Sequence, residues 1–142
     1  MPPNPMLSAY DKIGGVVWIP RMLRKIRLGA EGKLPADYQA NVGKGFDARC
    51  CRFLGIDHAA LAERVRKGGN DVEVFAWIWE NGSKPSPDMI LVWNEFMMKR
   101  GWRDSDSPAG KLQEHKEKSG LGHRSDIMTF FDYYEVDEGR RP

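Results

Sequence analysis

Apolar residues recur along most of the chain at intervals of three and four positions, a spacing typical of helices that pack one face against a core. The clearest stripe consists of Ile19, Met22, Leu23 and Ile26. Pro20 suits the first turn of this helix, where the missing N–H of proline does no harm, and Gly29 ends the stripe. The pattern predicts a helix from about residue 18 to residue 28.

Start and stop residues bracket the other helical stretches. Asn70 with Glu73 has the spacing of a capping box, and Ser86-Pro87-Asp88 combines a cap, a proline and an acid. We expect helices over residues 46–54, 58–67, 71–80, 87–100, 108–119 and 126–136, the last two opened by Ser107-Pro108 and by Ser125. Residues 30–45, with three glycines and a proline, are predicted to form a loop.

The ends of the chain lack a helical pattern. Residues 1–17 contain three prolines and are predicted to form an extended N-terminal arm, and residues 137–142 a frayed tail. Val16 to Ile19 is the best strand candidate, but Pro20 and the one-sided hydrophobicity argue against a strand. We therefore expect one all-α domain over residues 1–142, a compact irregular bundle of about six to seven short helices.

The inward positions of these helices define a predicted core. Its members are Met22, Leu23, Ile26, Phe53, Leu54, Leu61, Val65, Phe75, Ile78, Trp93, Met97, Phe130 and Phe131. Asp126, Asp132, Glu135, Asp137 and Glu138 alternate with aromatic residues near the C-terminus, and we expect these carboxylates to face water.

The composition is that of an ordinary globular chain of 142 residues, 41% hydrophobic and 30% charged. A chain of this length folds without a metal or a disulfide. Cys50 and Cys51 are adjacent, so they cannot build a disulfide framework. No apolar run approaches roughly 18 residues, and the first residues lack the apolar stretch of a signal peptide. We expect a cytoplasmic protein that does not enter membranes.

Charge is distributed unevenly along the chain. Residues 1–69 carry 12 Lys and Arg against 6 Asp and Glu, a net +6, whereas residues 70–142 carry 10 against 14, a net −4. One interpretation is that the first half attracts an anion. The other is that the two halves attract each other within the fold.

Short motifs spread along the chain resemble those of a known family. They are Gly14-Gly15-x-x-Trp18-Ile19-Pro20-Arg21-Met22-x-x-Lys25-x-Arg27, Phe53-Leu54-Gly55-Ile56-Asp57, Ala76-Trp77-Ile78, Trp93-Asn94 and Asp126-x-x-x-x-Phe131-Asp132, followed closely by Asp137-Glu138-Gly139-Arg140. In this order they resemble an uncharacterised bacterial family of small proteins, domain of unknown function 5069. The resemblance implies a compact helical domain. It implies no reaction, because that family has no assigned activity.

One cluster of residues suggests a binding site. Trp18, Arg21 and Lys25 follow a glycine pair, Asn41 lies in a Gly-rich loop, and Asn94 interrupts an otherwise apolar helix. Arginine gives bidentate contacts to carboxylate or phosphate, and a buried asparagine needs partners. The cluster predicts a pocket for a small anionic ligand. The alternative is that Asn94 bonds a loop carbonyl and the arginines shield the helix.

Other chemistries find less support. Cys50, Cys51, His58, His115 and His123 lack the paired spacing of a zinc site, so we expect no metal. No nucleophile elbow or phosphate-binding loop is present, and we expect no cofactor. A basic stripe of Arg21, Arg24, Lys25 and Arg27 favours at most weak contact with nucleic-acid backbones.

Three hypotheses therefore stand. The first is a non-catalytic domain that binds a small anion or a protein partner. The second is a small enzyme whose cleft is lined by Arg21, Asn94 and a carboxylate such as Asp47 or Asp132. The third is weak nucleic-acid binding, which the acidic helix 71–80 disfavours.

Overall fold

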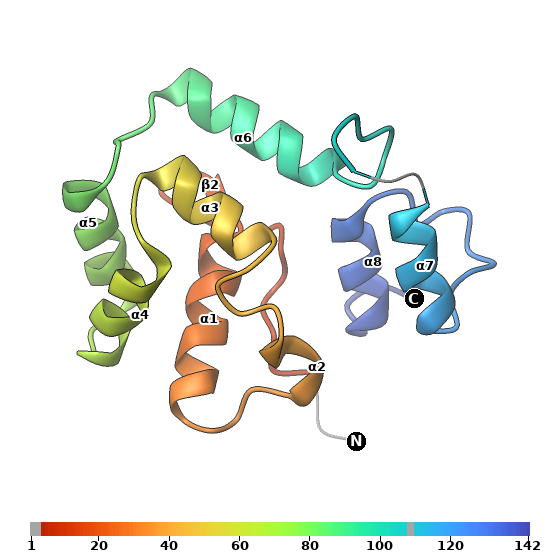
Figure 1. Cartoon of the computed structure of the whole chain (residues 1–142), viewed down its shortest axis with the longest axis horizontal. Coiled ribbons are helices and arrows are strands. Elements are labelled where there is room, and N and C mark those ends of the chain that lie inside the picture. The colour runs from red at the N-terminus through yellow and green to blue at the C-terminus, as the bar shows by residue number, and fades with distance from the viewer. Residues whose placement is uncertain (1–3, 108–109) are drawn as a thin grey trace.

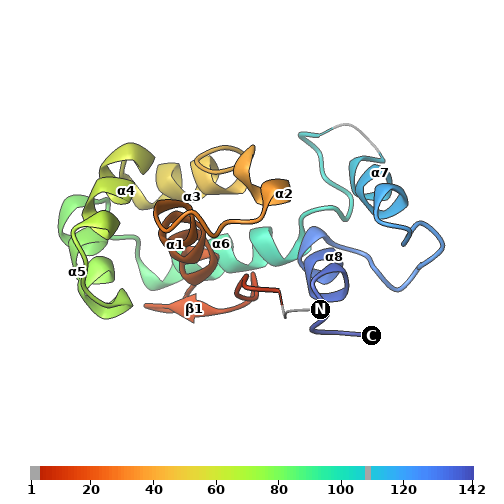
Figure 2. The same cartoon turned by 90° about the horizontal axis from the view of Figure 1, so that it is seen from below.

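The computed structural model describes residues 4–107 and 110–142, and within them the chain is mostly helical (Figure 1). This confirms the predicted fold class. The helices are α1 (Ile19–Ala30), α2 (Ala36–Gln39), α3 (Phe46–Leu54), α4 (His58–Arg66), α5 (Asp71–Asn81), α6 (Pro87–Lys99), α7 (Lys111–Lys118) and α8 (Phe130–Asp137). Helix α1 lies centrally, and α6 runs along one side of the molecule from α5 toward α8 (Figures 1 and 2).

The segment predicted as an extended arm contains a small β-hairpin. Strands β1 (Lys12–Ile13) and β2 (Val16–Val17) pair antiparallel, and β1 lies along the edge beneath α1 and α6 in Figure 2. Gly14 and Gly15 form the turn with φ of 59° and 79°, which only glycine adopts without strain. Strand β2 lies within the strand candidate Val16 to Ile19, so the argument against a strand is wrong for Val16 and Val17. Pro20 did not prevent it, because Pro20 lies in the first turn of α1. Two-residue strands are too short for a visible alternation, so the sequence did not reveal β1.

The core forms around α1, mainly where the predicted stripes meet. Ten predicted core residues are buried, namely Met22, Leu23, Ile26, Leu54, Leu61, Val65, Ile78, Trp93, Met97 and Phe131. Phe53, Phe75 and Phe130 are partly buried and pack against the core clusters. The hairpin joins this core, because Val16 and Val17 are fully buried.

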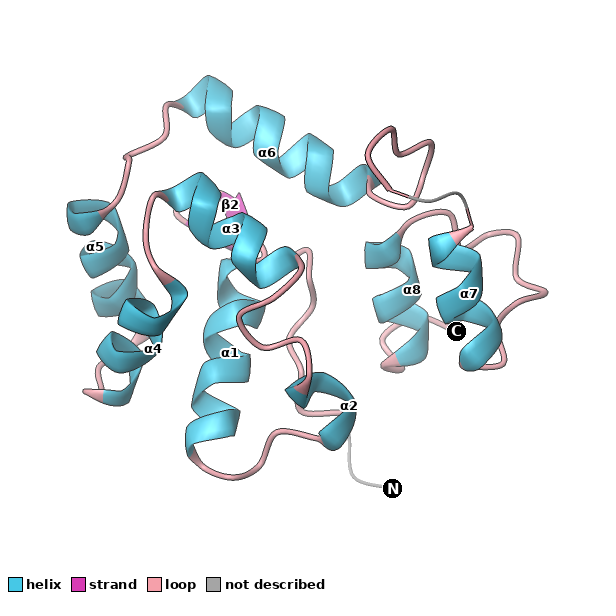
Figure 3. Ribbon diagram, viewed as in Figure 1, coloured by secondary structure: helices cyan, strands magenta, loops and turns pink. Residues whose placement is uncertain are grey.

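Three predicted boundaries are wrong or shifted. Residues 36–39, expected in a loop, form the short helix α2. Helix α7 begins at Lys111 after Gly110, and the predicted start at Pro108 lies outside the described residues. Helix α8 is capped by Thr129, whose hydroxyl accepts the Asp132 N–H (3.1 Å), and not by Ser125. Figure 3 shows the long loop that precedes α8.

Helix length also bears on membrane insertion. The longest described helix, α6, has 13 residues. Among the described residues, no helix has both the length and the apolar character needed to cross a bilayer.

The turn between α5 and α6 depends on a glycine. A Cβ at Gly82 would lie 2.1 Å from the Leu54 carbonyl oxygen and 2.8 Å from the Ile78 oxygen, both backbone atoms. We expect Gly82→Ala to lower the free energy of unfolding by about 1–3 kcal/mol, because the backbone must shift. Gly29→Ala is the matched control: nothing lies within 4 Å, and a helical alanine gains about 0.5–1 kcal/mol. Urea unfolding of both variants measures the change in the free energy of unfolding. Equal changes in Gly82→Ala and Gly29→Ala would contradict the close contact of Gly82 with the Leu54 and Ile78 backbone oxygens.

Candidate functional site

The structure brings Trp18, Arg21 and Lys25 together in one buried cluster at the start of α1. The Arg21 guanidinium carbon lies 5.5 Å and the Lys25 ammonium 5.0 Å from the centre of the Trp18 ring. Trp18 has φ of 80°, which is unusual for a bulky residue and indicates that its surroundings hold it there. Two cations thus share one aromatic ring inside the protein, and both need a counter-charge.

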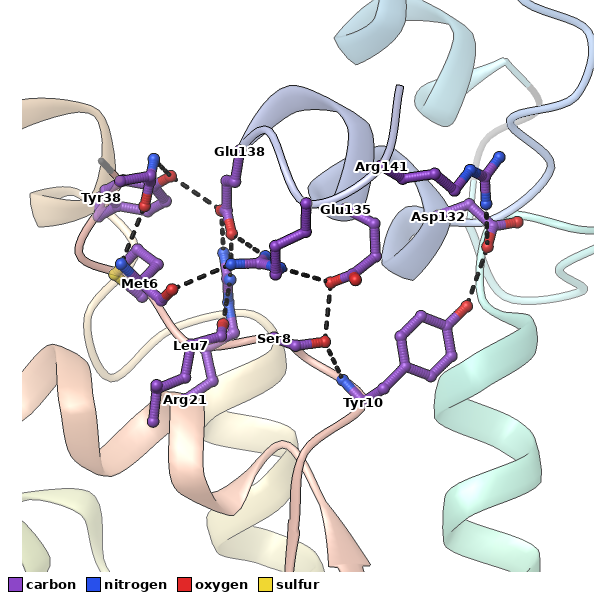
Figure 4. Close-up of polar contacts among 12 residues, drawn as sticks. Met6, Leu7, Ser8, Tyr10, Arg21, Tyr38, Asp132, Glu135, Glu138 and Arg141 are labelled. Carbon is purple, nitrogen blue, oxygen red and sulfur yellow. Dashed lines mark hydrogen bonds and ion pairs between the residues drawn. The ribbon is translucent and has the colours of Figure 1, made fainter. Parts of the chain in front are cut away.

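Arg21 finds its counter-charge in Glu138, which follows α8. The two guanidinium nitrogens donate to the two carboxylate oxygens at 2.7 and 2.6 Å, and the Arg21 and Glu138 side chains are 2% and 1% exposed (Figure 4). Arg21 also donates to the Leu7 carbonyl (2.9 Å). The anion bound to Arg21 is therefore a carboxylate of the chain itself.

The same carboxylate connects the two ends of the chain. Glu138 accepts a hydrogen bond from the Tyr38 hydroxyl (2.8 Å) and one from Arg140, which in turn donates to the Met6 carbonyl (3.0 Å) (Figure 4). Burial, together with the Glu138 charge, raises the pKa of Tyr38 to about 12. The prediction of a water-facing Glu138 is wrong, because tertiary contacts bury this carboxylate.

Lys25 is neutralised by Asp47 near the start of α3. Its ammonium lies 2.8 Å from Asp47 Oδ2, which also accepts the Gly43 backbone N–H (3.1 Å), and Asp47 Oδ1 accepts the Trp18 indole N–H (2.9 Å). Burial lowers the pKa of Lys25, and the charge of Asp47 acts in the opposite direction. Asp47 therefore ties α1 to the loop before α3.

The two predicted asparagines have other surroundings. Asn94 accepts the Val17 N–H (3.0 Å) and donates to the Gly15 carbonyl (2.8 Å), so it holds the hairpin against α6. This is the loop carbonyl bond of the alternative interpretation. Asn41 is exposed in its loop, where its backbone N–H donates to the Tyr38 carbonyl (3.3 Å).

A signal for the buried pairs was present in the sequence. Trp18, Arg21 and Lys25 are spaced so that they share one side of the helix, and a tryptophan is usually buried. Cations on the same side then require carboxylates from elsewhere. Which acids supply them could not be read, because Asp47 and Glu138 are distant in sequence.

Two surface hollows adjoin these elements. A groove of about 550 Å³ between α3 and α6 is lined by Arg49, Arg52, Phe53, Asp88, Met89, Val92, Trp93 and Phe96. A pocket of about 580 Å³ between α1 and α4 is lined by Lys25, His58 and Arg66 together with small and aliphatic residues. Both lie within the usual size of ligand sites.

Metal and thiol chemistry find no support in the described residues. No group of three or more His, Cys, Asp or Glu side chains there could hold a metal ion. Burial raises the pKa of the Cys50 thiol well above its ordinary value and that of Cys51 to about 12. Both thiols are therefore protonated near neutral pH and are poor nucleophiles.

Comparison with protein-family models gives a match. The model of a family described as a domain of unknown function, DUF5069, matches residues 4–140 and confirms the resemblance seen in the sequence motifs. No curated protein matches the chain.

Removing the Glu138 charge tests the buried pair. We expect Glu138→Gln to lower the free energy of unfolding by ~3–5 kcal/mol, because it leaves the Arg21 charge buried and uncompensated. Glu31→Gln removes the carboxylate of an exposed pair with Lys33 (3.8 Å) and should cost about 0.5 kcal/mol or less. Chemical unfolding of both variants measures the two losses in the free energy of unfolding. Similar losses would show that burial of the Arg21–Glu138 pair is unimportant.

The pair also predicts a pH dependence. Burial alone raises the pKa of Glu138, but hydrogen bonding and the charge of Arg21 outweigh it and hold the pKa below its ordinary value of 4.5. Its contribution is complete above pH 4.5 and is lost as the pH falls through the lower pKa of the folded state. The unfolding free energy of the wild type should therefore fall more steeply below pH 4.5 than that of Glu138→Gln. If the unfolding free energies of the wild type and of Glu138→Gln fell in parallel below pH 4.5, the lowered pKa of Glu138 would be contradicted.

Proposed function

The chain belongs to the DUF5069 family, a domain of unknown function, and we propose that it is a non-catalytic interaction domain that associates with a second copy of itself through the groove between α3 and α6. The observation that carries the proposal is the apolar outer face of α6. Met89 and Val92, which line the groove, are 53% and 67% exposed. Neighbouring exposed apolar residues of this kind are typical of interaction surfaces.

Contacts on the inner side of α6 hold this helix against the core. The Trp93 ring stacks on Phe53 with centroids 4.7 Å apart, and its indole N–H donates to the Val17 carbonyl (3.3 Å). Asn94 binds the hairpin on the same helix. The helix is therefore held firmly, and a partner can bind its outer face with little ordering of the backbone.

The charges around the groove favour a second copy as the occupant. Arg49 and Arg52 lie on the α3 side and Asp88 on the α6 side. Within residues 4–107 and 110–142, neither Arg52 nor Asp88 takes part in an ion pair. A two-fold interface joins a surface to itself, so a surface with apolar residues between opposite charges is complementary to its own copy.

The register of such a pair follows from helix geometry. If two α6 helices pack antiparallel about Val92, residue 88 of one copy lies opposite residue 96 of the other. The Arg49 guanidinium lies 5.1 Å from the Phe96 ring centre. Asp88 of one copy would then approach Arg49 of the other, which within its own chain also pairs with Asp106 (3.4 Å).

A charge placed in the groove tests the proposal. We expect the wild type to show twice the mass of one chain in sedimentation equilibrium as its concentration rises from micromolar to millimolar. Val92→Glu should weaken association about 30-fold or more, because it buries an unpaired charge at the centre. Val72→Glu is the matched control, since Val72 is 71% exposed on α5 and does not line the groove. A monomer at all concentrations would overturn self-association.

An exchange of charges tests the register. Asp88→Arg should weaken association, and Asp88→Arg with Arg49→Glu should restore part of it, because each copy then again presents opposite charges. Weakening without any restoration would exclude the antiparallel register.

A further inference from the structure

We propose that the pocket between α1 and α4 binds a small organic anion through a carboxylate or phosphate group. This site differs from the groove on α6 and from the Arg21 pair. Three basic residues line it, namely Lys25, His58 and Arg66. Within the described part of the chain, no acidic side chain lines it. The pocket therefore offers three basic groups around one cavity of about 580 Å³.

His58 provides an independent indication. Its Nε2 is buried, and among the described residues it has no hydrogen-bond partner. Buried polar atoms are nearly always paired in native structures. In the tautomer protonated at Nε2, this nitrogen lacks an acceptor, and an anionic oxygen that displaced the atoms covering it would supply one.

Within the described residues, Arg66 takes part in no ion pair and supplies the free positive charge, whereas Lys25 supplies hydrogen-bond donors. Lys25 is buried and its ammonium is bound to Asp47 (2.8 Å), but an ammonium has three donors. Arg66 is exposed and can meet an anion as it enters. Ile26, Val42 and Ala62 line the rest of the cavity, which suits a short apolar portion of the ligand.

Titration with two probe anions tests the site. Inorganic phosphate and butyrate, each added at constant ionic strength, should shift the amide resonances of residues around His58 and Arg66 in ¹H–¹⁵N spectra. Arg66→Gln and His58→Phe should each weaken binding about tenfold, the loss expected for one hydrogen bond to a charged group. Lys67→Gln is the matched control, because it removes the same charge from the next residue, which does not line the pocket.

The outcomes separate clearly. Binding of butyrate alone identifies a carboxylate site, and binding of phosphate alone identifies a phosphate site. Absence of saturable shifts with both anions would overturn the proposal. An equal loss in Arg66→Gln and Lys67→Gln would also overturn it, because it would reveal attraction to the charged surface only. Thermal melting of each variant verifies that its fold is intact, and Val92→Glu should bind both probes as the wild type does.

Discussion

Two positive charges on one side of α1 lie inside the protein, and the rest of the structure depends on their neutralisation. An unpaired buried charge is far more costly than the net stability of a domain can bear. Glu138 must therefore reach Arg21 from the end of α8, and Asp47 must reach Lys25 from the start of α3. Closing these two pairs brings distant parts of the chain onto the central helix.

The uneven charge along the sequence has the same explanation. Among the residues that the structure describes, three ion pairs join the basic first half to the acidic second half: Arg21 with Glu138, Arg27 with Asp71, and Arg49 with Asp106. Of the basic stripe on α1, Arg21 is buried and Arg24 donates to the Pro5 carbonyl (2.9 Å). The positive charge that suggested an anion in the sequence is thus largely used within the fold.

What remains on the surface carries the two proposals. Because Trp93 and Asn94 are fixed against the hairpin, α6 presents Met89 and Val92 outward on a rigid backbone. Because small residues separate α1 from α4, a cavity remains beside Lys25 that larger side chains would have filled. One surface is apolar with opposite charges at its sides and the other is basic and concave, so they suit different partners.

The sequence by itself determined the local structure. Helix positions followed from apolar spacing and from caps such as Asn70 and Ser86, because these signals act within a few residues. Only the tertiary structure decided that Arg21 binds a buried Glu138 and that Asn94 holds a hairpin. Each of these contacts joins residues more than 70 positions apart, and their formation depends on the packing of the whole chain.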